Sequence, residues 1–287
     1  MPLHSLGDFL LEVRKVREKW NTDDEDLWFR GERKAYGQSR LRPKLYRNLA
    51  KPSAKSRLDL LENETSFFED FKRCGGPLCD TPPEDEWEWY FLMQHYGGPT
   101  RLLDWSDGAL MALHFAIRDY PRAKGDALVY ILDAGWLGDL LDDGTYYRSV
   151  KKNWNKFCRT SDQDKNEWDV TYLPHDSEDR RKIPLAAAPL LWDPPHVTRR
   201  FAAQRSRFMI FGNEPNWLSR LADKRESKLC AIAIEEIAIP EIKRELRGAG
   251  VTESVIFPDL DGLGREQSQR WEDSRRNRKP AAPREPS

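Results

Sequence analysis

The stretch QHYGGPTRLLDWS, residues 94–106, combines a turn signal with a dense group of side chains that can bind or react. Residues 97–99, Gly-Gly-Pro, predict a sharp turn between two hydrophobic segments. Polar residues on both sides of a tight turn are often functional, so Arg101, Asp104 and Trp105 after the turn are candidates, with His95 before it. The structural alternative is an Arg101–Asp104 ion pair beside a Trp105 that anchors the core.

A second cluster lies upstream in WFRGE, residues 28–32, where an apolar, strand-like run ends in Arg30 and Gly31. An arginine on a rigid strand can hold a phosphate or carboxylate with two hydrogen bonds. The glycine after it allows a ligand or another backbone to approach closely. Two clusters of this kind in one chain favour a functional site.

Composition limits the classes of protein. The chain has 287 residues, of which 39% are hydrophobic, so it can form one large core, and we expect a single domain over residues 1–271. The net charge is -1 although 33% of residues are charged, which makes attraction to nucleic acid or membrane unlikely as the main function. Residues 6–16 predict an amphipathic helix capped by Ser5, with no signal peptide or membrane span, so a cytoplasmic protein is expected. The four scattered cysteines favour neither a metal site nor disulfides.

Hydrophobic spacing predicts secondary structure along most of the chain. Helices are expected at 6–16, 58–71, 86–94, 108–117, 239–247 and 259–271, and strands at 27–31, 127–132, 208–211, 229–234 and 254–257. Shorter helical and strand-like pieces are expected between residues 186 and 204. Helices and strands of irregular length favour an α+β or mixed α/β fold. Residues 142–182 are polar and charged and predict a long excursion with one or more short helices, and residues 272–287 predict a disordered basic tail.

Four blocks of sequence, taken together, resemble one known family. They are WFRGE (28–32), QHYGGPTRLLDWS with ALMALHFAI (94–117), RRFAAQ with Phe208 (199–208), and VIFPDLDGL (255–263). In this order they resemble the FRG domain, a bacterial family named for the Phe-Arg-Gly run that stands here as Phe29, Arg30 and Gly31. Ser206 stands where the family pattern has a glycine.

A looser similarity points to a reaction. Arginine-specific ADP-ribosyltransferases present an NAD-binding arginine in an aromatic-Arg-Gly run at the end of a first strand. The similarity implies an α+β fold with a mixed, mainly antiparallel split sheet and flanking helices, like that of the ADP-ribosyltransferases. It also implies NAD as substrate without a metal. The expected function is an NAD-handling effector, an ADP-ribosyltransferase or NAD glycohydrolase, in bacterial toxin action or anti-phage defence.

This resemblance assigns roles to individual residues. Cleavage of the nicotinamide–ribose bond passes through an oxocarbenium-like state, which needs a diphosphate clamp, an aromatic wall and a carboxylate. The expected catalytic residues are Asp104, His95 and Gln204; the expected NAD-binding residues are Arg30, Gly31, Arg101, Tyr96, Trp105 and Arg200. Glu32 is the second candidate for the carboxylate, and Asp104 could instead pair with Arg101 or cap the next helix.

Two other functions stay open. The domain could bind a nucleotide or a phage component without turnover, as a sensing module with a protein target or partner. Residues 40–47 and the basic tail could contact nucleic acid, with strongly salt-dependent affinity. Outside the site, His114 in its apolar helix is expected to be a hydrogen-bonded core histidine. Asp259 and Asp261 are expected to cap the final helix rather than bind a metal.

Overall fold

The computed structural model describes most of the chain. The described residues are 3–33, 40–49, 53–122, 124–142, 172–174, 186–192 and 199–277; residues 54–55, 199–201 and 276–277 are described by their backbone alone. The polar excursion predicted at 142–182 therefore lies almost wholly outside the described residues, as do residues 278–287 of the predicted tail.

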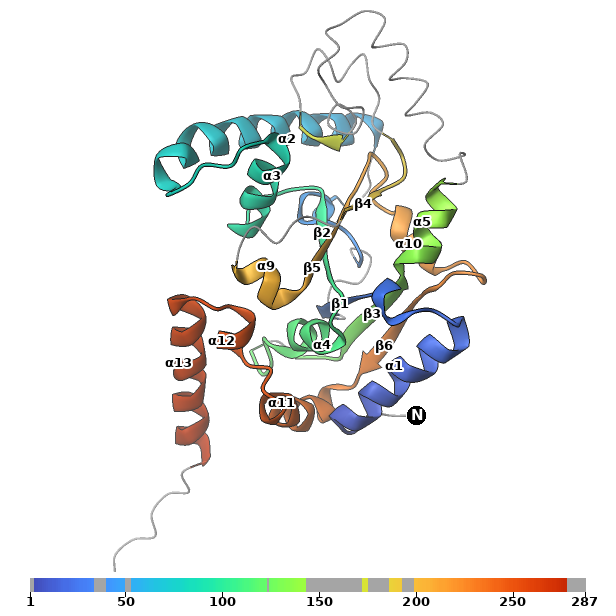
Figure 1. Cartoon of the computed structure of the whole chain (residues 1–287), viewed down its shortest axis with the longest axis vertical. Coiled ribbons are helices and arrows are strands. Elements are labelled where there is room, and N and C mark those ends of the chain that lie inside the picture. The colour runs from blue at the N-terminus through green and yellow to red at the C-terminus, as the bar shows by residue number, and fades with distance from the viewer. Residues whose placement is uncertain are drawn as a thin grey trace, which may run out of the picture.

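The centre of the fold is an open six-stranded sheet with the order β4-β5-β2-β1-β3-β6 (Figure 1). All of its described strand pairs are antiparallel. The strands are β1 Leu27–Arg33, β2 Leu102–Ser106, β3 Ala127–Asp133, β4 Leu190–Trp192, β5 Ser206–Ile210 and β6 Leu229–Ile234. Each strand pairs with segments far away in sequence, so tertiary contacts alone establish the sheet.

Helices surround this sheet. They are α1 Leu6–Trp20, α2 Ala54–Gly75, α3 Glu86–His95, α4 Ala109–Ile117, α5 Ala134–Asp142, α9 Arg199–Gln204, α10 Trp217–Ala222, α11 Ile239–Gly248, α12 Glu253–Ile256 and α13 Leu260–Asn277. Short 3-10 turns occur at Asp24–Asp26, Lys44–Tyr46, Gly76–Leu78 and Glu236–Ala238. The α+β class is thus confirmed, whereas the finer likeness to ADP-ribosyltransferases stays a prediction.

Two hydrophobic clusters divide the core. One joins β2, β4 and β5 to α2, α3, α5 and α10 and includes Trp28, Tyr130 and Leu132 from one face of β1 and β3. The other joins the opposite face of β1, β3 and β6 to α1, α4 and α11. Figure 1 shows the same division, with α2 and α3 at one end of the molecule and α1, α4 and α11 at the other. The two clusters therefore lie on opposite faces of β1 and β3, whose successive side chains alternate between them.

Local sequence signals determine where α1 begins and where α3 ends. Ser5 caps α1 in a capping box with Asp8, as the sequence predicted. At the end of α3, the N–H of Gly98 donates to Met93 O at 2.8 Å and that of Gly97 donates to Gln94 O at 2.9 Å. Gly97 has a φ of 82°, and these bonds form a Schellman motif. The predicted turn is therefore the C-terminal cap of α3, and it directs the chain into β2.

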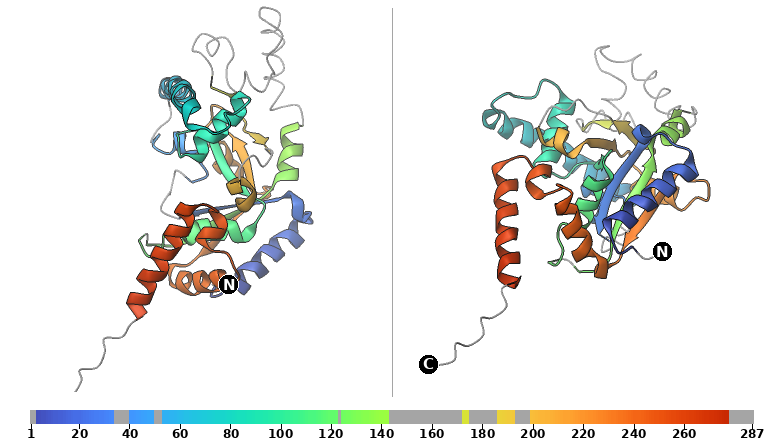
Figure 2. Two further views of the ribbon diagram at one scale, coloured as in Figure 1. Left: turned by 60° about the vertical axis from the view of Figure 1, so that its left-hand side comes forward. Right: turned by 60° about the horizontal axis from the view of Figure 1, so that its bottom comes forward.

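The observed elements differ from the predicted ones at three places. Residues 254–256 belong to α12, which Phe257 follows, and not to a strand, because the Glu253 side chain fixes this turn against α4 and α13. Helices α5 and α10 lacked a predictive pattern. Helix α13 continues past Trp271 to Asn277, so residues 272–277 are helical, and Figure 2 shows its C-terminal end pointing away from the rest of the molecule.

Candidate functional site

The sheet divides between β1 and β2. The register between these two strands contains the single pair Phe29↔Ser106, whereas β1 pairs with β3, and β2 with β5, along their full lengths. A cavity of about 260 Å³ lies at this division. Its walls are formed by Phe29, Arg30, Gly31, Gln94, His95, Asp104, Trp105, Ser106, Ala112, Phe115, Gln204, Ser206 and Phe208. The fold therefore brings six predicted site residues together: Arg30, Gly31, His95, Asp104, Trp105 and Gln204.

Arg30 bridges the division of the sheet. Its Nε donates to Glu32 Oε1 at 2.7 Å, and its Nη1 donates to the main-chain oxygen of Asp104 at 2.5 Å. Glu32 is 2% exposed and also accepts a hydrogen bond from the N–H of Leu41 at 3.0 Å. The buried pair balances the charge of Arg30, and the guanidinium nitrogen Nη2 takes no part in these contacts. Glu32, the second carboxylate candidate, is thus a partner of Arg30.

Gly31 has the packing role that the sequence predicted, in which another backbone approaches the strand closely. A Cβ atom at this position would lie 1.9 Å from Ala112 O and 2.5 Å from Ala116 N. The backbone of α4 therefore approaches β1 so closely that only glycine fits here. This contact sets the position of α4, which contributes Ala112 and Phe115 to the cavity wall.

Asp104 is an exposed residue of β2 and is held by the end of α3. Its two carboxylate oxygens accept hydrogen bonds from Gln94 Nε2 at 3.1 and 3.0 Å, and Gln94 Oε1 in turn accepts one from Thr100. The carboxylate is oriented by a neutral amide and not by the arginine that follows the turn. Sequence reasoning left Gln94 out of the site, although it opens the decisive stretch.

Arg101 lies outside the cavity wall, in the hydrophobic core. It is 0% exposed, and its Nε donates to Glu64 Oε2 at 2.7 Å. Burial alone would lower the pKa of Arg101, but the charge of Glu64 outweighs it and raises that pKa. Burial, with the charge of Glu64, raises the pKa of Tyr90 well above its ordinary value, and the Tyr90 hydroxyl donates to Glu64 Oε1. These contacts make Arg101 part of a buried structural network.

The other predicted residues lie around the cavity. His95 lines it, and its ring packs edge-on against Tyr96 at 5.0 Å; Tyr96 is 74% exposed and outside the wall. Gln204 donates to Ile256 O at 3.3 Å through its amide, and its main-chain oxygen accepts a hydrogen bond from Ser106 at 2.8 Å. Arg200 lies in α9, and its side chain is outside the described part of the structure.

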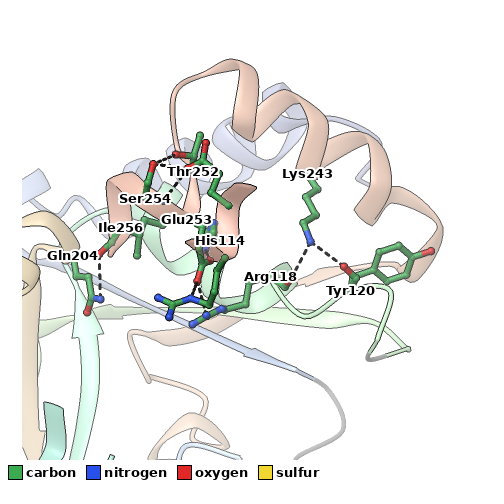
Figure 3. Close-up of polar contacts among 11 residues, drawn as sticks. His114, Arg118, Tyr120, Gln204, Lys243, Thr252, Glu253, Ser254 and Ile256 are labelled. Atoms are coloured by element: carbon green, nitrogen blue, oxygen red, sulfur yellow. Dashed lines mark hydrogen bonds and ion pairs between the residues drawn. The ribbon is translucent and has the colours of Figure 1, made fainter. Parts of the chain in front are cut away.

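Polar contacts of Glu253 link α12 to α4 and α13 (Figure 3). Glu253 accepts hydrogen bonds from Arg118 Nη2 at 2.7 Å and Arg265 Nε at 2.8 Å, and its Oε2 lies 3.1 Å from His114 Nε2. His114 is 8% exposed, which confirms the predicted core histidine. Asp259 accepts from the N–H of Gly262 at 2.6 Å and so caps α13, as predicted.

A larger cavity of about 760 Å³ lies between α1 and the start of α4. Its arginines already have acidic partners: Arg17 pairs with Asp24 at 2.7 Å, and Arg207 pairs with Asp107 at 2.8 Å. The smaller cavity is the better candidate for a functional site, because the side chains that can bind a ligand or take part in a reaction converge there. Among the described residues, no group of His, Cys, Asp or Glu is placed to hold a metal ion. No helix in the described ranges is long and apolar enough to span a bilayer.

Comparison with known proteins agrees with the sequence blocks at the start of the chain. The sequence model of the FRG domain matches residues 25–125. This range runs from just before β1 to just before β3, and so includes the β1, α3, β2 and α4 walls of the cavity. The α9 and β5 walls lie beyond it. No curated protein and no solved structure matches the chain.

Proposed function

We propose, from the premise that this chain carries an FRG domain over residues 25–125, that the domain binds NAD in the cavity between β1 and β2 and cleaves its nicotinamide–ribose bond. One observation carries the proposal: residues from β1, α3, β2 and α9 that were selected by chemistry line a single cavity. Packing alone does not explain why an arginine, a histidine, a carboxylate and an amide from separate segments gather beside aromatic rings.

The cavity suits one half of the dinucleotide. Small-molecule sites usually measure about 300–1,000 Å³, and about 260 Å³ corresponds to a nucleoside and not to the whole of NAD. Phe29, Phe115 and Phe208 offer aromatic surface for a flat ring. In the proposed complex the nicotinamide and its ribose occupy the cavity, and the guanidinium of Arg30 binds the diphosphate.

The proposed reaction uses few protein groups. As the bond between C1′ of the ribose and the ring nitrogen breaks, its electron pair neutralises the pyridinium and positive charge develops on the ribose. The carboxylate of Asp104, oriented by Gln94, stabilises that charge, while His95 and Gln204 bind ribose hydroxyls. Water then bonds to C1′ and loses a proton, which yields ADP-ribose, nicotinamide and one proton. A nucleophile on a target macromolecule in place of water gives ADP-ribosyl transfer.

The test compares Asp104→Asn with Asp80→Asn, an exposed aspartate that precedes α3 and lies outside the cavity wall. NAD consumption is followed by chromatography and NAD binding by calorimetry, with ADP-ribose and nicotinamide as the products. We expect Asp104→Asn to lower kcat by roughly 100-fold or more with little change in affinity, because the carboxylate acts on the transition state. Wild-type activity in Asp104→Asn would remove its catalytic role, and an absence of NAD binding would refute the proposal.

Binding without turnover is the second candidate, and the Arg30–Glu32 pair is the observation that favours it. Because that pair is buried and electrically balanced, Arg30 serves the structure of the sheet whether or not a reaction occurs. A sensing module of this kind would gain thermal stability with NAD, or with a phage component, and release no product.

In the enzyme proposal the protein acts as a toxin-like or anti-phage effector, so its expression in bacteria lowers cellular NAD and Asp104→Asn abolishes that effect.

A further inference from the structure

The indole nitrogen of Trp105 is a buried hydrogen-bond donor without a partner among the described residues. Trp105 is 3% exposed and forms part of the cavity wall. Among the other buried side chains of the described residues, the hydroxyl groups of Tyr130 and Ser227 also lack a partner, and neither residue lines the cavity. Buried donors in folded proteins nearly always have a partner, so the exception at the cavity points to an acceptor supplied by a ligand.

The charges around Trp105 select the kind of acceptor. Since Phe29 pairs with Ser106 in an antiparallel register, Arg30 and Trp105 occupy adjoining positions on β1 and β2. The guanidinium of Arg30 is already balanced by Glu32 at 2.7 Å, and the carboxylate of Asp104 also lines the cavity. An anionic group beside the indole would be close to carboxylates, whereas a neutral carbonyl oxygen would not be repelled. Flat aromatic walls favour a ring that carries this carbonyl.

We infer that the indole N–H of Trp105 donates a hydrogen bond to a carbonyl oxygen on a flat ring of the ligand. The identity of that ring rests on the proposed function, in which it is nicotinamide and the oxygen belongs to its carboxamide. A pyrimidine base presents the same chemistry through its ring carbonyls.

The experiment follows the indole N–H directly in ¹H–¹⁵N spectra of the full-length protein, where the Trp105 signal is the one that Trp105→Phe removes. The pyridine probes are nicotinamide, 3-acetylpyridine, which keeps the carbonyl, and 3-ethylpyridine, which has a similar size but no carbonyl; uridine is the pyrimidine probe. Nicotinamide and 3-acetylpyridine should move the signal and bind roughly 2- to 10-fold more tightly than 3-ethylpyridine. Trp105→Phe keeps the aromatic wall but should bind all three with similar affinity.

The matched control is Trp28→Phe, which removes a buried indole on β1 outside the cavity wall and should leave the discrimination intact. Turnover of NAD with an unmoved Trp105 signal would overturn this inference and leave the proposed function standing. A response to uridine but not to nicotinamide would support the indole–carbonyl contact and refute NAD as the ligand. If none of these compounds moves the signal, the inference is wrong.

Discussion

Glu253 offers the sharpest test of how this fold is held together, because one buried carboxylate joins three helices. It is 9% exposed and contacts His114 and Arg118 of the α4 region and Arg265 of α13. Burial by itself would raise the pKa of Glu253, but the His114 hydrogen bond, the charge of Arg118 and the Arg265 hydrogen bond outweigh it and lower this pKa to about 2. Replacement by glutamine keeps the shape and removes the charge.

The size of the effect follows from the shift in pKa. A carboxyl whose ordinary pKa of 4.5 falls to about 2 on folding stabilises the folded state by about 3 kcal/mol when it is ionised in both states. Because the pKa is depressed in the folded protein, this stabilisation is complete above about pH 4.5 and is lost as the pH falls towards 2. Glu253→Gln also leaves two arginines beside a neutral group, so we expect a loss of about 3 kcal/mol at pH 7.

Urea unfolding at pH 7, 5, 4 and 3, followed by circular dichroism, measures the difference in unfolding free energy between wild type and Glu253→Gln. The difference should be largest at pH 7 and shrink steadily below pH 4.5, and this subtraction removes the effect of the other carboxyls. Glu241→Gln, at an exposed ion pair with Arg244 on α11, is the matched control and should leave stability unchanged. Equal stability of Glu253→Gln and wild type at pH 7, or a difference independent of pH, would refute the reasoning.

Two further predictions concern packing around the site. Gly31→Ala should lower the unfolding free energy by at least about 2 kcal/mol in urea titrations, since its Cβ would lie 1.9 Å from Ala112 O. Gly138→Ala in α5, where nothing lies within 4 Å of the new Cβ, is the control and should not destabilise the protein. Equal effects of the two substitutions would contradict the close approach of α4. Arg101→Met should cost about 3–5 kcal/mol because it leaves Glu64 charged and unpaired in the core, and Arg101→Met with Glu64→Leu should cost less than Arg101→Met alone. Additive losses in that double-mutant cycle would show that the two groups do not interact.

Much of the local structure follows from short-range sequence signals. Ser5 and the residues after it predict α1, and the alternation in residues 229–234 predicts β6 with the observed bounds. The strand predicted at 254–257 is wrong, since Val255 and Ile256 favour a strand locally, whereas the contacts of Glu253 with α4 and α13 hold them in a helical turn. Those contacts join distant residues, so no local pattern contains them.

The sequence by itself determined which side chains are available: Arg30 before a glycine, and Asp104 and Trp105 after a tight turn that forms because glycine accepts a positive φ. It also determined the segments, because apolar spacing and caps act within a few residues. The tertiary structure alone decided that Arg101 belongs to the core with Glu64 and that Arg30 faces the cavity. Two arginines with the same chemistry differ in role because each charge must find its partner when the chain folds, and that partner depends on which strands and helices become neighbours.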